Sequence, residues 1–332
     1  MRFRKFLKPY KTRGSSFREH TTIIGGKSMN IAVLSDIHGN EIALQSCMKY
    51  LENQSIDAYC FLGDYIGEFP GIRGVMDTLY ALQKKVPCYM IRGNKEEYML
   101  SGMGDAHPEW DSYPSTVGML RYGRQQLTQE DLSFIKALPV TARISIDGMK
   151  DLRICHGTPR AVREDMRPQN SQNKEILAEV EEEYMLCGHT HRVMALREYG
   201  KTIWNPGSVG LPIIEEGGIK TQFMILHSSN GAWHPEFVAL DYDIERVIQD
   251  MYENGLYEIA PYWTRTTACI LRGEHMTHGM MLGRAMALCE QETGRCDWPA
   301  VPEIFWKQAF EERPERKVLC MPKGGGVKND GI

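Results

Sequence analysis

Residues 30–40 read NIAVLSDIHGN, a short apolar run that ends in a polar loop. The run is rich in β-branched and aliphatic residues and too short for a helix, which is typical of a strand buried on both faces. Asn40 then precedes a helical pattern over 41–53, and asparagine is a favoured N-cap residue. The stretch predicts a strand, a loop that carries Asp36 and His38, and a helix.

Four further apolar runs have the same character. They are Ala58–Leu62, Cys88–Arg92, Leu152–Cys155 and Tyr184–Cys187. Helical patterns separate the first three runs of the chain, and strands that alternate with helices indicate parallel βαβ units. A largely helical insertion is predicted at about 97–138. Later alternations around Gly148, Gly200 and Asn230-Gly231 predict antiparallel hairpins.

Each of the five runs is followed by side chains that can bind a metal ion, with a glycine beside them. These side chains are Asp36, His38, Asp64, Asn94, His156, His189 and His191. Ligands of open α/β sheets bind at the carboxyl ends of the strands, so we expect the seven to converge on one sheet edge. Carboxylates, imidazoles and an amide oxygen suit Mn, Fe, Zn, Co or Ni, and one carboxylate can bridge two ions. Each residue alone has an ordinary structural explanation, but five such strand ends together favour a metal site.

The composition narrows the class of protein. Hydrophobic residues make up 42% of the 332, charged residues 25%, and the net charge is −4, which is ordinary for a globular protein and does not favour nucleic acid as the main partner. The nine cysteines are odd in number and form no C-x-x-C, so we expect free thiols and a cytoplasmic location. No window approaches 18 uninterrupted apolar residues, and no membrane span is expected.

Three parts of the chain differ in pattern. Residues 1–28 carry eight Lys or Arg against one acid, and we expect a leader without fixed structure, with Met29 as the native start or a transit peptide as the alternative. Residues 29–240 hold the strands and should form one domain. Residues 241–332 are predicted to be a helical extension with a flexible tail. Its aromatic residues are expected to be mainly core, with a substrate cleft or an oligomer contact as alternatives.

The motifs D-x-H, G-D, G-N, H-G and G-H-x-H occur in this order, within the segments LSDIHGN, LGDYIGEFPG, IRGNKE, HGTPR and CGHTHR, followed by NPGSVG. In these motifs residues 29–240 resemble the calcineurin-like metallophosphoesterases, most closely their small bacterial and archaeal phosphodiesterase branch, the YfcE type. The resemblance implies an α/β fold, a four-layer α/β/β/α sandwich of two mixed sheets around a dinuclear metal site.

The resemblance also implies a role for each residue. The first ion would be held by Asp36, His38 and His191, the second by Asn94, His156 and His189, and Asp64 would bridge them. A small phosphodiester or phosphomonoester would be hydrolysed by attack of a metal-bridging hydroxide on phosphorus. The residues implied to be catalytic are Asp64, Asn94, Lys95 and His156. Two divalent ions are expected, manganese first, with Fe, Zn, Ni or Co as alternatives, and a homo-oligomer is left open.

The chain departs from the family pattern after Asn94. The family often has a histidine there, which resembles the general acid for the leaving group, whereas this chain has Lys95. A lysine stabilises an anion but donates a proton poorly at neutral pH, and the alternative is a solvated loop lysine. Arg92 resembles the phosphate-binding arginine of related phosphatases, or is a surface charge. Arg160 is a further candidate for phosphate binding, although a structural ion pair is favoured.

Two other functions stay open. Nucleotide pyrophosphohydrolysis, for example of dinucleoside polyphosphates, would use the same ligands. A binding scaffold, such as the retromer subunit of similar architecture, would tolerate loss of ligands. All seven ligand positions are intact in this chain, which favours an enzyme with a small phosphorylated substrate.

Overall fold

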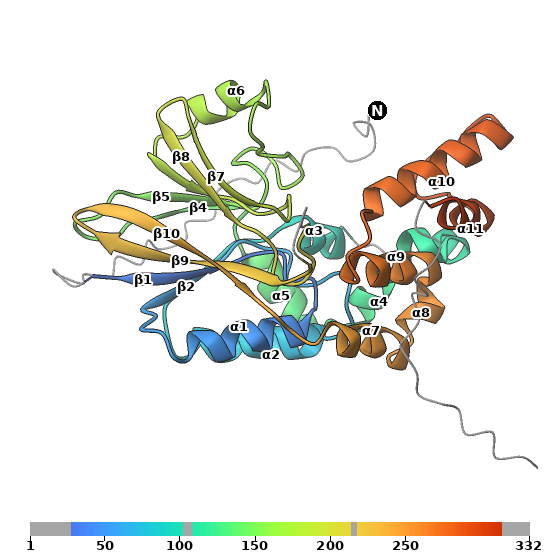
Figure 1. Ribbon diagram of the computed structural model, residues 1–332, viewed down its shortest axis with the longest axis horizontal. Coiled ribbons are helices and arrows are strands. Elements are labelled where there is room, and N and C mark those ends of the chain that lie inside the picture. Colours follow the sequence, from blue (N-terminus) through green and yellow to red (C-terminus); the bar gives the residue numbers. More distant parts are fainter. Residues whose placement is uncertain (1–27, 102–107, 214–217, 314–332) are drawn as a thin grey trace, which may run out of the picture.

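The computed structural model describes residues 28–101, 108–213 and 218–313. The expected leader, residues 1–28, lies outside these ranges except for Ser28, and the expected tail, residues 320–332, lies wholly outside them. Within them, the strands form two five-stranded sheets that face each other, and helices cover the outer face of each sheet (Figure 1).

The first sheet has the strand order β10-β9-β1-β2-β3. Its strands are β1 (Asn30–Leu34), β2 (Ala58–Phe61), β3 (Cys88–Met90), β9 (Thr221–Ser229) and β10 (Ala232–Leu240). β1, β2 and β3 run parallel, as the alternation of strands and helices predicts, and β9 and β10 join antiparallel. Between β9 and β10, Asn230 and Gly231 have φ of 51° and 74°, the left-handed conformation that a two-residue hairpin turn requires.

The second sheet has the order β4-β5-β6-β8-β7. Its strands are β4 (Thr141–Ile144), β5 (Leu152–Cys155), β6 (Tyr184–Leu186), β7 (Val193–Glu198) and β8 (Lys201–Pro206). β5, β6 and β8 run parallel, and β4 and β7 pair antiparallel at the edges. The five apolar runs therefore belong to two sheets. The expectation of one shared sheet edge is corrected, because the ends of β1, β2 and β3 face the ends of β5 and β6.

Helices complete the layers. Those of the first 180 residues are α1 (Glu41–Leu51), α2 (Ile72–Gln83), α3 (Asn94–Leu100), the 3₁₀ helix η1 (Pro108–Ser112), α4 (Pro114–Gln126), α5 (Gln129–Ala137) and α6 (Asn173–Ala178). Asn40 caps α1, because its side chain accepts a hydrogen bond from the backbone N of Ala43 at 3.0 Å. α1 and α2 cover the first sheet and α6 covers the second (Figure 1).

The core consists of three hydrophobic clusters, and the side chains of β1 enter two of them. Ile31 and Val33 point into the cluster between the two sheets, while Ala32 and Leu34 point into the cluster beneath α1 and α2. A third cluster, with Ile176 of α6, covers the outer face of the second sheet. The layers are helix, sheet, sheet and helix, which confirms the predicted four-layer sandwich and explains why the central strands are apolar on both faces.

A C-terminal helical region follows β10. Its helices are α7 (Ile244–Glu253), α8 (Leu256–Ile259), α9 (Pro261–Leu271), α10 (His278–Thr293) and α11 (Glu303–Glu311). They enclose a hydrophobic cluster that also includes Phe69, Tyr122 and Leu211 of the preceding domain. Within it Trp306 is fully buried, and its indole donates to Oγ1 of Thr116 at 2.9 Å. The expectation that its aromatic residues are core is confirmed for Trp306.

Among the described residues, seven cysteines are free thiols: Cys47, Cys60, Cys88, Cys155, Cys187, Cys289 and Cys296. The expectation of free thiols is wrong for Cys269, which is disulfide-bonded. In the described part of the chain, no helix combines the length and apolar character that crossing a membrane requires.

Candidate metal centre

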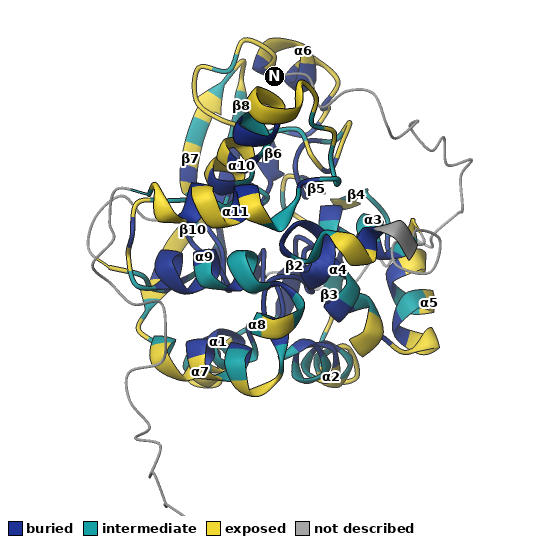
Figure 2. Cartoon of the chain, turned by 90° about the vertical axis from the view of Figure 1, so that its right-hand side faces the viewer, coloured by how far each residue is buried: buried dark blue, intermediate teal, exposed yellow. Residues whose placement is uncertain are grey.

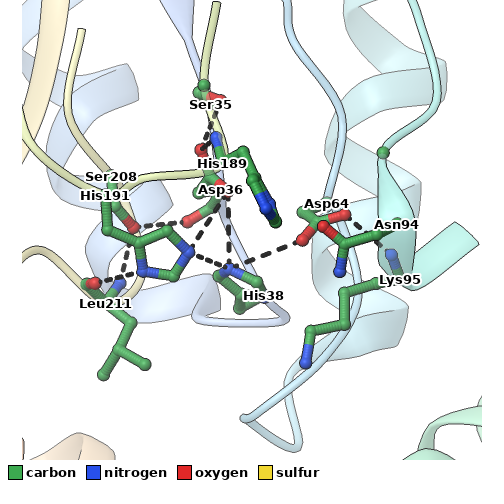
Figure 3. A network of polar contacts seen from close by, with 12 residues as sticks. Ser35, Asp36, His38, Asp64, Asn94, Lys95, His189, His191, Ser208 and Leu211 are labelled. Carbon is green, nitrogen blue, oxygen red and sulfur yellow. Dashed lines mark hydrogen bonds and ion pairs between the residues drawn. The ribbon is translucent and has the colours of Figure 1, made fainter. Parts of the chain in front are cut away.

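The side chains that follow several strands gather in one polar cluster, in which Figure 3 shows Asp36, His38, Asp64, Asn94, His189 and His191. The first sheet contributes the side chains that follow β1, β2 and β3, which are Asp36, His38, Asp64 and Asn94. The second sheet contributes those that follow β5 and β6, which are His156, His189 and His191. The fold thus brings all seven predicted ligands to the space where the two sheets end.

Five of these residues present ligand atoms to one another at short range. Among the described residues, Asp36-His38-His191 and Asp36-Asp64-His156 form two groups in which the ligand atoms lie within 4.8 Å of one another. Nε2 of His191 lies 2.9 Å from Nε2 of His38 and 3.2 Å from Oδ1 of Asp36. Nε2 of His156 lies 3.5 Å from Oδ2 of Asp64. Asp36 is common to both groups, whereas the resemblance gave the shared position to Asp64.

The other two predicted ligands border the second group. Oδ1 of Asn94 lies 3.0 Å from Nε2 of His156. The ring of His189 packs edge to face against the ring of His156, with centroids 5.2 Å apart. The backbone N of His189 also donates to Oδ2 of Asp36 at 3.0 Å. Asn94 therefore adds a neutral oxygen to the group, and His189 adds an imidazole at its edge.

The outer ring nitrogens of the buried histidines have fixed partners. Nδ1 of His156 donates to the carbonyl of Leu62 at 2.7 Å, and Nδ1 of His191 donates to the carbonyl of Leu211 at 2.6 Å. A carbonyl can only accept, so in the neutral ring the proton sits on Nδ1 and the lone pair on Nε2 points inward. Metal-binding histidines are held in this way, with the second ring nitrogen donating to a carbonyl or a carboxylate.

Only one of the two carboxylate oxygens of Asp36 has hydrogen-bond partners among the described residues. Its Oδ2 accepts from the hydroxyl of Ser35 at 2.5 Å, but its buried Oδ1 has no hydrogen-bond partner within the described structure. Around Oδ1 stand the inward nitrogens of His191 at 3.2 Å, His38 at 3.7 Å and His156 at 3.8 Å. Acceptors that face one another in a buried space repel unless protons or a cation lie between them. The residues present therefore fit divalent metal ions of borderline softness.

The backbone at the candidate ligands is strained. Five of the seven residues have a left-handed φ: Asp36 at 55°, His38 at 57°, Asp64 at 52°, His189 at 66° and His191 at 56°. Such conformations cost of order 1–3 kcal/mol each and persist where the surrounding structure imposes them. The backbone N of Asp36 donates to the carbonyl of Gly63 at 3.1 Å, and that of His38 to the carbonyl of Asp64 at 2.9 Å. These bonds tie the loop after β1 to the loop after β2 and aim the side chains.

The charges of the metal-free cluster are strongly coupled. Burial lowers the pKa of His38, but Glu68, Asp36 and Asp64 together outweigh it and raise that pKa to about 10. Burial likewise lowers the pKa of His156, but Asp64 and Asp36 raise it to about 9. Burial would raise the pKa of both aspartates, yet the imidazoles hold their pKa values below the usual range. Without metal, protons on these histidines therefore hold the carboxylates together.

Glu68 is a site residue that the motif analysis did not single out. It is only 4% exposed, and its Oε2 lies 2.6 Å from Nδ1 of His38. Its Oε1 lies 2.5 Å from Nζ of Lys95. One carboxylate thus orients a candidate ligand and pairs with the lysine that replaces the family's histidine. The only signal in the sequence was an acid in the glycine-rich segment GDYIGEFPG.

Lys95 is not a solvated loop lysine, because its side chain is only 11% exposed. Its backbone N donates to Oδ1 of Asp64 at 2.8 Å, at the start of α3. Burial lowers the pKa of its ammonium, but Glu68 and Asp64 together outweigh it and raise that pKa above the usual range. Lys95 is therefore a fixed positive charge beside Asp64 and Asn94, and a poor proton donor.

Glu96 is a second buried acid that the motif analysis did not single out. Its carboxylate accepts from the backbone N of Asp64, Tyr65 and Gly93 at 2.8, 2.8 and 2.7 Å. It therefore fixes the loops after β2 and β3 relative to each other. Gly93 is required here, because an added Cβ would collide with Oδ1 of Asp64.

The two arginines suggested for phosphate binding have structural partners. Nη1 of Arg92 donates to the carbonyl of Leu138 at 2.6 Å, which ties β3 to the end of α5. Arg160 forms a bidentate pair with Glu179, at 2.9 and 2.7 Å, on the surface beside α6. The structural ion pair favoured for Arg160 is present. Both guanidinium groups thus have structural partners, and phosphate binding by either arginine stays a prediction.

The sequence is similar to a known protein family and to an archaeal protein. The sequence matches the model of the calcineurin-like phosphoesterase superfamily domain over residues 29–231. It is 25% identical over 249 residues to the uncharacterised protein MJ0912 of Methanocaldococcus jannaschii, which covers 70% of this chain and 95% of that protein.

Two solved structures share the fold. Hypothetical protein PH1004 from Pyrococcus horikoshii OT3 has a TM-score of 0.59 and 22% identity, over 71% of this chain and 97% of that one. A metallophosphoesterase from Sphaerobacter thermophilus has a TM-score of 0.54 and 22% identity, over 69% of this chain and 95% of that one. The matched family model ends before α7, so the C-terminal helical region lies outside it.

Proposed function

The chain belongs to the calcineurin-like phosphoesterase superfamily, and we propose that it hydrolyses a small phosphodiester or phosphomonoester with the help of two divalent metal ions. One observation carries the proposal. The buried Oδ1 of Asp36 lacks a hydrogen-bond partner among the described residues, and the inward nitrogens of three histidines surround it. That arrangement requires positive charge between the acceptors, either as protons on the histidines or as bound metal ions.

The ligands divide between two ions. Asp36, His38 and His191 would hold the first ion, Asn94, His156 and His189 the second, and Asp64 would lie between them. Bound ions of this kind lower the pKa of a water molecule, polarise phosphoryl oxygens and stabilise negative charge as it develops. Manganese suits this mixed set of oxygen and nitrogen ligands, and Fe, Zn, Ni and Co are the alternatives.

The protein's own side chains prepare the site. Ser35 and the backbone N of His189 hold one oxygen of Asp36, so its other oxygen faces inward. Lys95 supplies a fixed positive charge beside Asp64, which favours binding of a phosphate anion. Since this lysine is a poor proton donor, we propose that the enzyme favours substrates whose leaving group departs without a proton, such as phenolates.

The composition of the chain supports a proposal for its substrate class, partners and location. We propose a small phosphorylated substrate, without nucleic acid or a membrane as partner, and a cytoplasmic location. A homo-oligomer remains open as a proposal. The net charge of −4 gives no excess of positive charge for binding a polyanion.

The test is a substrate screen on metal-free protein reloaded with Mn, Ni, Co, Zn or Mg. The substrates are p-nitrophenyl phosphate, bis(p-nitrophenyl) phosphate, an alkyl phosphodiester and a dinucleoside polyphosphate. We expect hydrolysis of an aryl ester with Mn, and loss of activity and bound metal in Asp64→Asn. Asp57→Asn is the matched control, since Asp57 accepts from the backbone N of Asn30 at the opposite end of β1.

Each outcome of the screen separates the candidate functions. Activity on the dinucleoside polyphosphate alone would favour a pyrophosphohydrolase. Metal binding without hydrolysis of any substrate would favour a metal-binding scaffold. Equal metal content in Asp64→Asn and the unmutated protein would contradict the proposed centre.

A further inference from the structure

The C-terminal helical region lies beyond the carboxyl ends of the strands. In Figure 1, β1 and β2 run toward the side of the molecule that holds α9 and α10, and Figure 2 looks onto that side. Two side chains of this region lie near the candidate metal centre, Trp263 in α9 and His278 at the start of α10. Neither belongs to the family domain, which is matched only to residue 231.

Trp263 reaches the centre through Lys95. Nζ of Lys95 lies 5.8 Å from the centroid of the Trp263 ring, within the range of a cation–π interaction. The same ammonium lies 2.5 Å from Oε1 of Glu68. Lys95 is thus held by a carboxylate from the loop after β2 and by an aromatic ring from α9, two parts of the chain that are far apart in sequence.

His278 fixes the ring of Trp263 by stacking on it, with centroids 4.3 Å apart and an interplanar angle of 13°. The hydroxyl of Thr267 donates to the carbonyl of Trp263 at 3.0 Å, so Nε2 of His278, 2.8 Å from that hydroxyl oxygen, is the donor of the second bond. Burial lowers the pKa of His278 to about 3 against the opposing charge of Glu68, and Lys95 and His38 add to the lowering. The stacked ring is therefore neutral and does not repel the ammonium of Lys95.

α9 itself is anchored to the core of the phosphoesterase domain. The hydroxyl and the backbone N of Ser115 in α4 donate to the carboxylate of Glu303 in α11, at 2.7 and 2.8 Å. The same hydroxyl oxygen accepts from the backbone N of Tyr262, next to Trp263, at 2.9 Å. The position of the Trp263 ring is thus set by rigid elements and not by a loose surface contact.

We propose that Trp263 is a positioning residue for phosphoester hydrolysis, which with Glu68 fixes the ammonium of Lys95 beside the candidate metal centre. This inference rests on the proposed function, and it gives the C-terminal helices a part in the active site. A lysine side chain has considerable rotamer freedom, which a free side chain loses on binding an anion. A lysine that is already held binds the phosphate group with less entropic cost.

The test is a double-mutant cycle on the full-length protein loaded with Mn. Trp263→Leu should lower kcat/KM for p-nitrophenyl phosphate about 3- to 30-fold, the range of a buried cation–π interaction, and should weaken calorimetric binding of inorganic phosphate to a similar extent. Trp263→Phe keeps an aromatic face and should lose less. In a Lys95→Met background, either substitution should have no further effect, because residues that act through one another are not additive.

Trp298→Leu is the matched control. Trp298 is a partly buried tryptophan of the same helical region that packs against Trp110, at 5.5 Å between centroids, and not on Lys95. Trp298→Leu should lower the free energy of unfolding but leave the affinity for inorganic phosphate unchanged. Should Trp263→Leu fail to fold, the milder Trp263→Phe carries the same comparison with Lys95→Met.

Losses that are equal with and without Lys95 would overturn the proposal, because a merely structural tryptophan gives that result. An unchanged phosphate affinity in both Trp263 variants of an active enzyme would also overturn it. Absence of both hydrolysis and phosphate binding in the unmutated protein would instead contradict the proposed function, and this inference with it.

Discussion

Replacement of Glu68 by glutamine should weaken metal binding, because Glu68 orients the candidate ligand His38. Oε2 of Glu68 lies 2.6 Å from Nδ1 of His38, and Oε1 lies 2.5 Å from Nζ of Lys95. Both atoms of the carboxylate thus face donors. An amide has a single oxygen to accept and turns its NH₂ group toward the other donor. Glu68→Gln must therefore leave either His38 or Lys95 without its partner.

The size of the effect follows from which partner is lost. If the amide oxygen stays on Lys95, His38 loses the group that fixes its ring, and metal affinity should fall roughly 10- to 100-fold. If it stays on His38, the 11% exposed Lys95 is left unpaired, and the free energy of unfolding should fall by about 3–5 kcal/mol. Since Glu68 is only 4% exposed, solvent offers little compensation for either loss.

The assay is calorimetric titration of metal-free protein with Mn, together with unfolding in urea. Glu97→Gln is the control, since Glu97 in α3 is 37% exposed and lies 3.6 Å from Arg92. We expect it to change neither quantity by much, as for most surface ion pairs. Manganese affinity and unfolding free energy that both equal those of the control would refute the role of Glu68.

Three further outcomes are expected. Chelation of the ions should lower the melting temperature relative to protein in excess Mn, because the ions bind only the native chain. At a metal concentration 100-fold above Kd, this binding stabilises the native state by about 2.7 kcal/mol. Equal melting temperatures with chelator and with Mn would mean that no site is formed. Apparent Mn affinity should rise with pH up to about 10, because without metal the pKa of His156 is raised to about 9 and that of His38 to about 10, and bound ions must displace these protons. Calorimetry in buffers of different ionisation enthalpy measures the released protons, and a pH-independent affinity would contradict this. Asp131→Ala should lower the free energy of unfolding by about 1–3 kcal/mol without loss of activity, because Asp131 accepts from Tyr80 at 2.7 Å and from the hydroxyl of Thr128 at 2.7 Å; urea unfolding that matches the unmutated protein would contradict it.

The ligand set was readable from the sequence because each ligand follows a strand closely. Asp36 comes two residues after β1 and His156 one residue after β5, so the apolar run that predicts the strand also places the ligand. Glycines mark the same loops, since the close approach of Gly93 to Asp64 leaves no room for a Cβ. These are local signals, and a short window of sequence contains them.

The assignment of strands to sheets was not local, and the prediction of one shared edge was wrong for that reason. β3 and β5 look alike as apolar runs, but β3 pairs with β2 while β5 pairs with β4 and β6. Register and partner depend on the helical insertion that separates them, whose packing a hydrophobic pattern does not specify. Only the family resemblance indicated two sheets.

The partners of charged side chains also could not be predicted from the sequence. Glu68 and Lys95 are 27 residues apart, and Arg160 and Glu179 are 19 apart, so neither pair has a periodic signature. The motif neighbourhood suggested phosphate binding for Arg92, yet its guanidinium bonds to the carbonyl of Leu138, 46 residues later. A motif gives the residue type and its loop, whereas the direction of a long side chain depends on what packs over it.

The backbone of the site sets its shape before any ion binds. The strained conformations of Asp36, His38 and Asp64 are held by hydrogen bonds between the loops after β1 and β2, and Glu96 clamps the loop after β3 to them. The side chains so aimed present acceptors to one another, an arrangement that is unfavourable without protons or cations. Metal ions would therefore take the place of the protons that hold these acceptors together in the metal-free protein. A site formed in this way needs little rearrangement on binding, which makes the metal affinity depend on the rigid loops as much as on the ligands themselves.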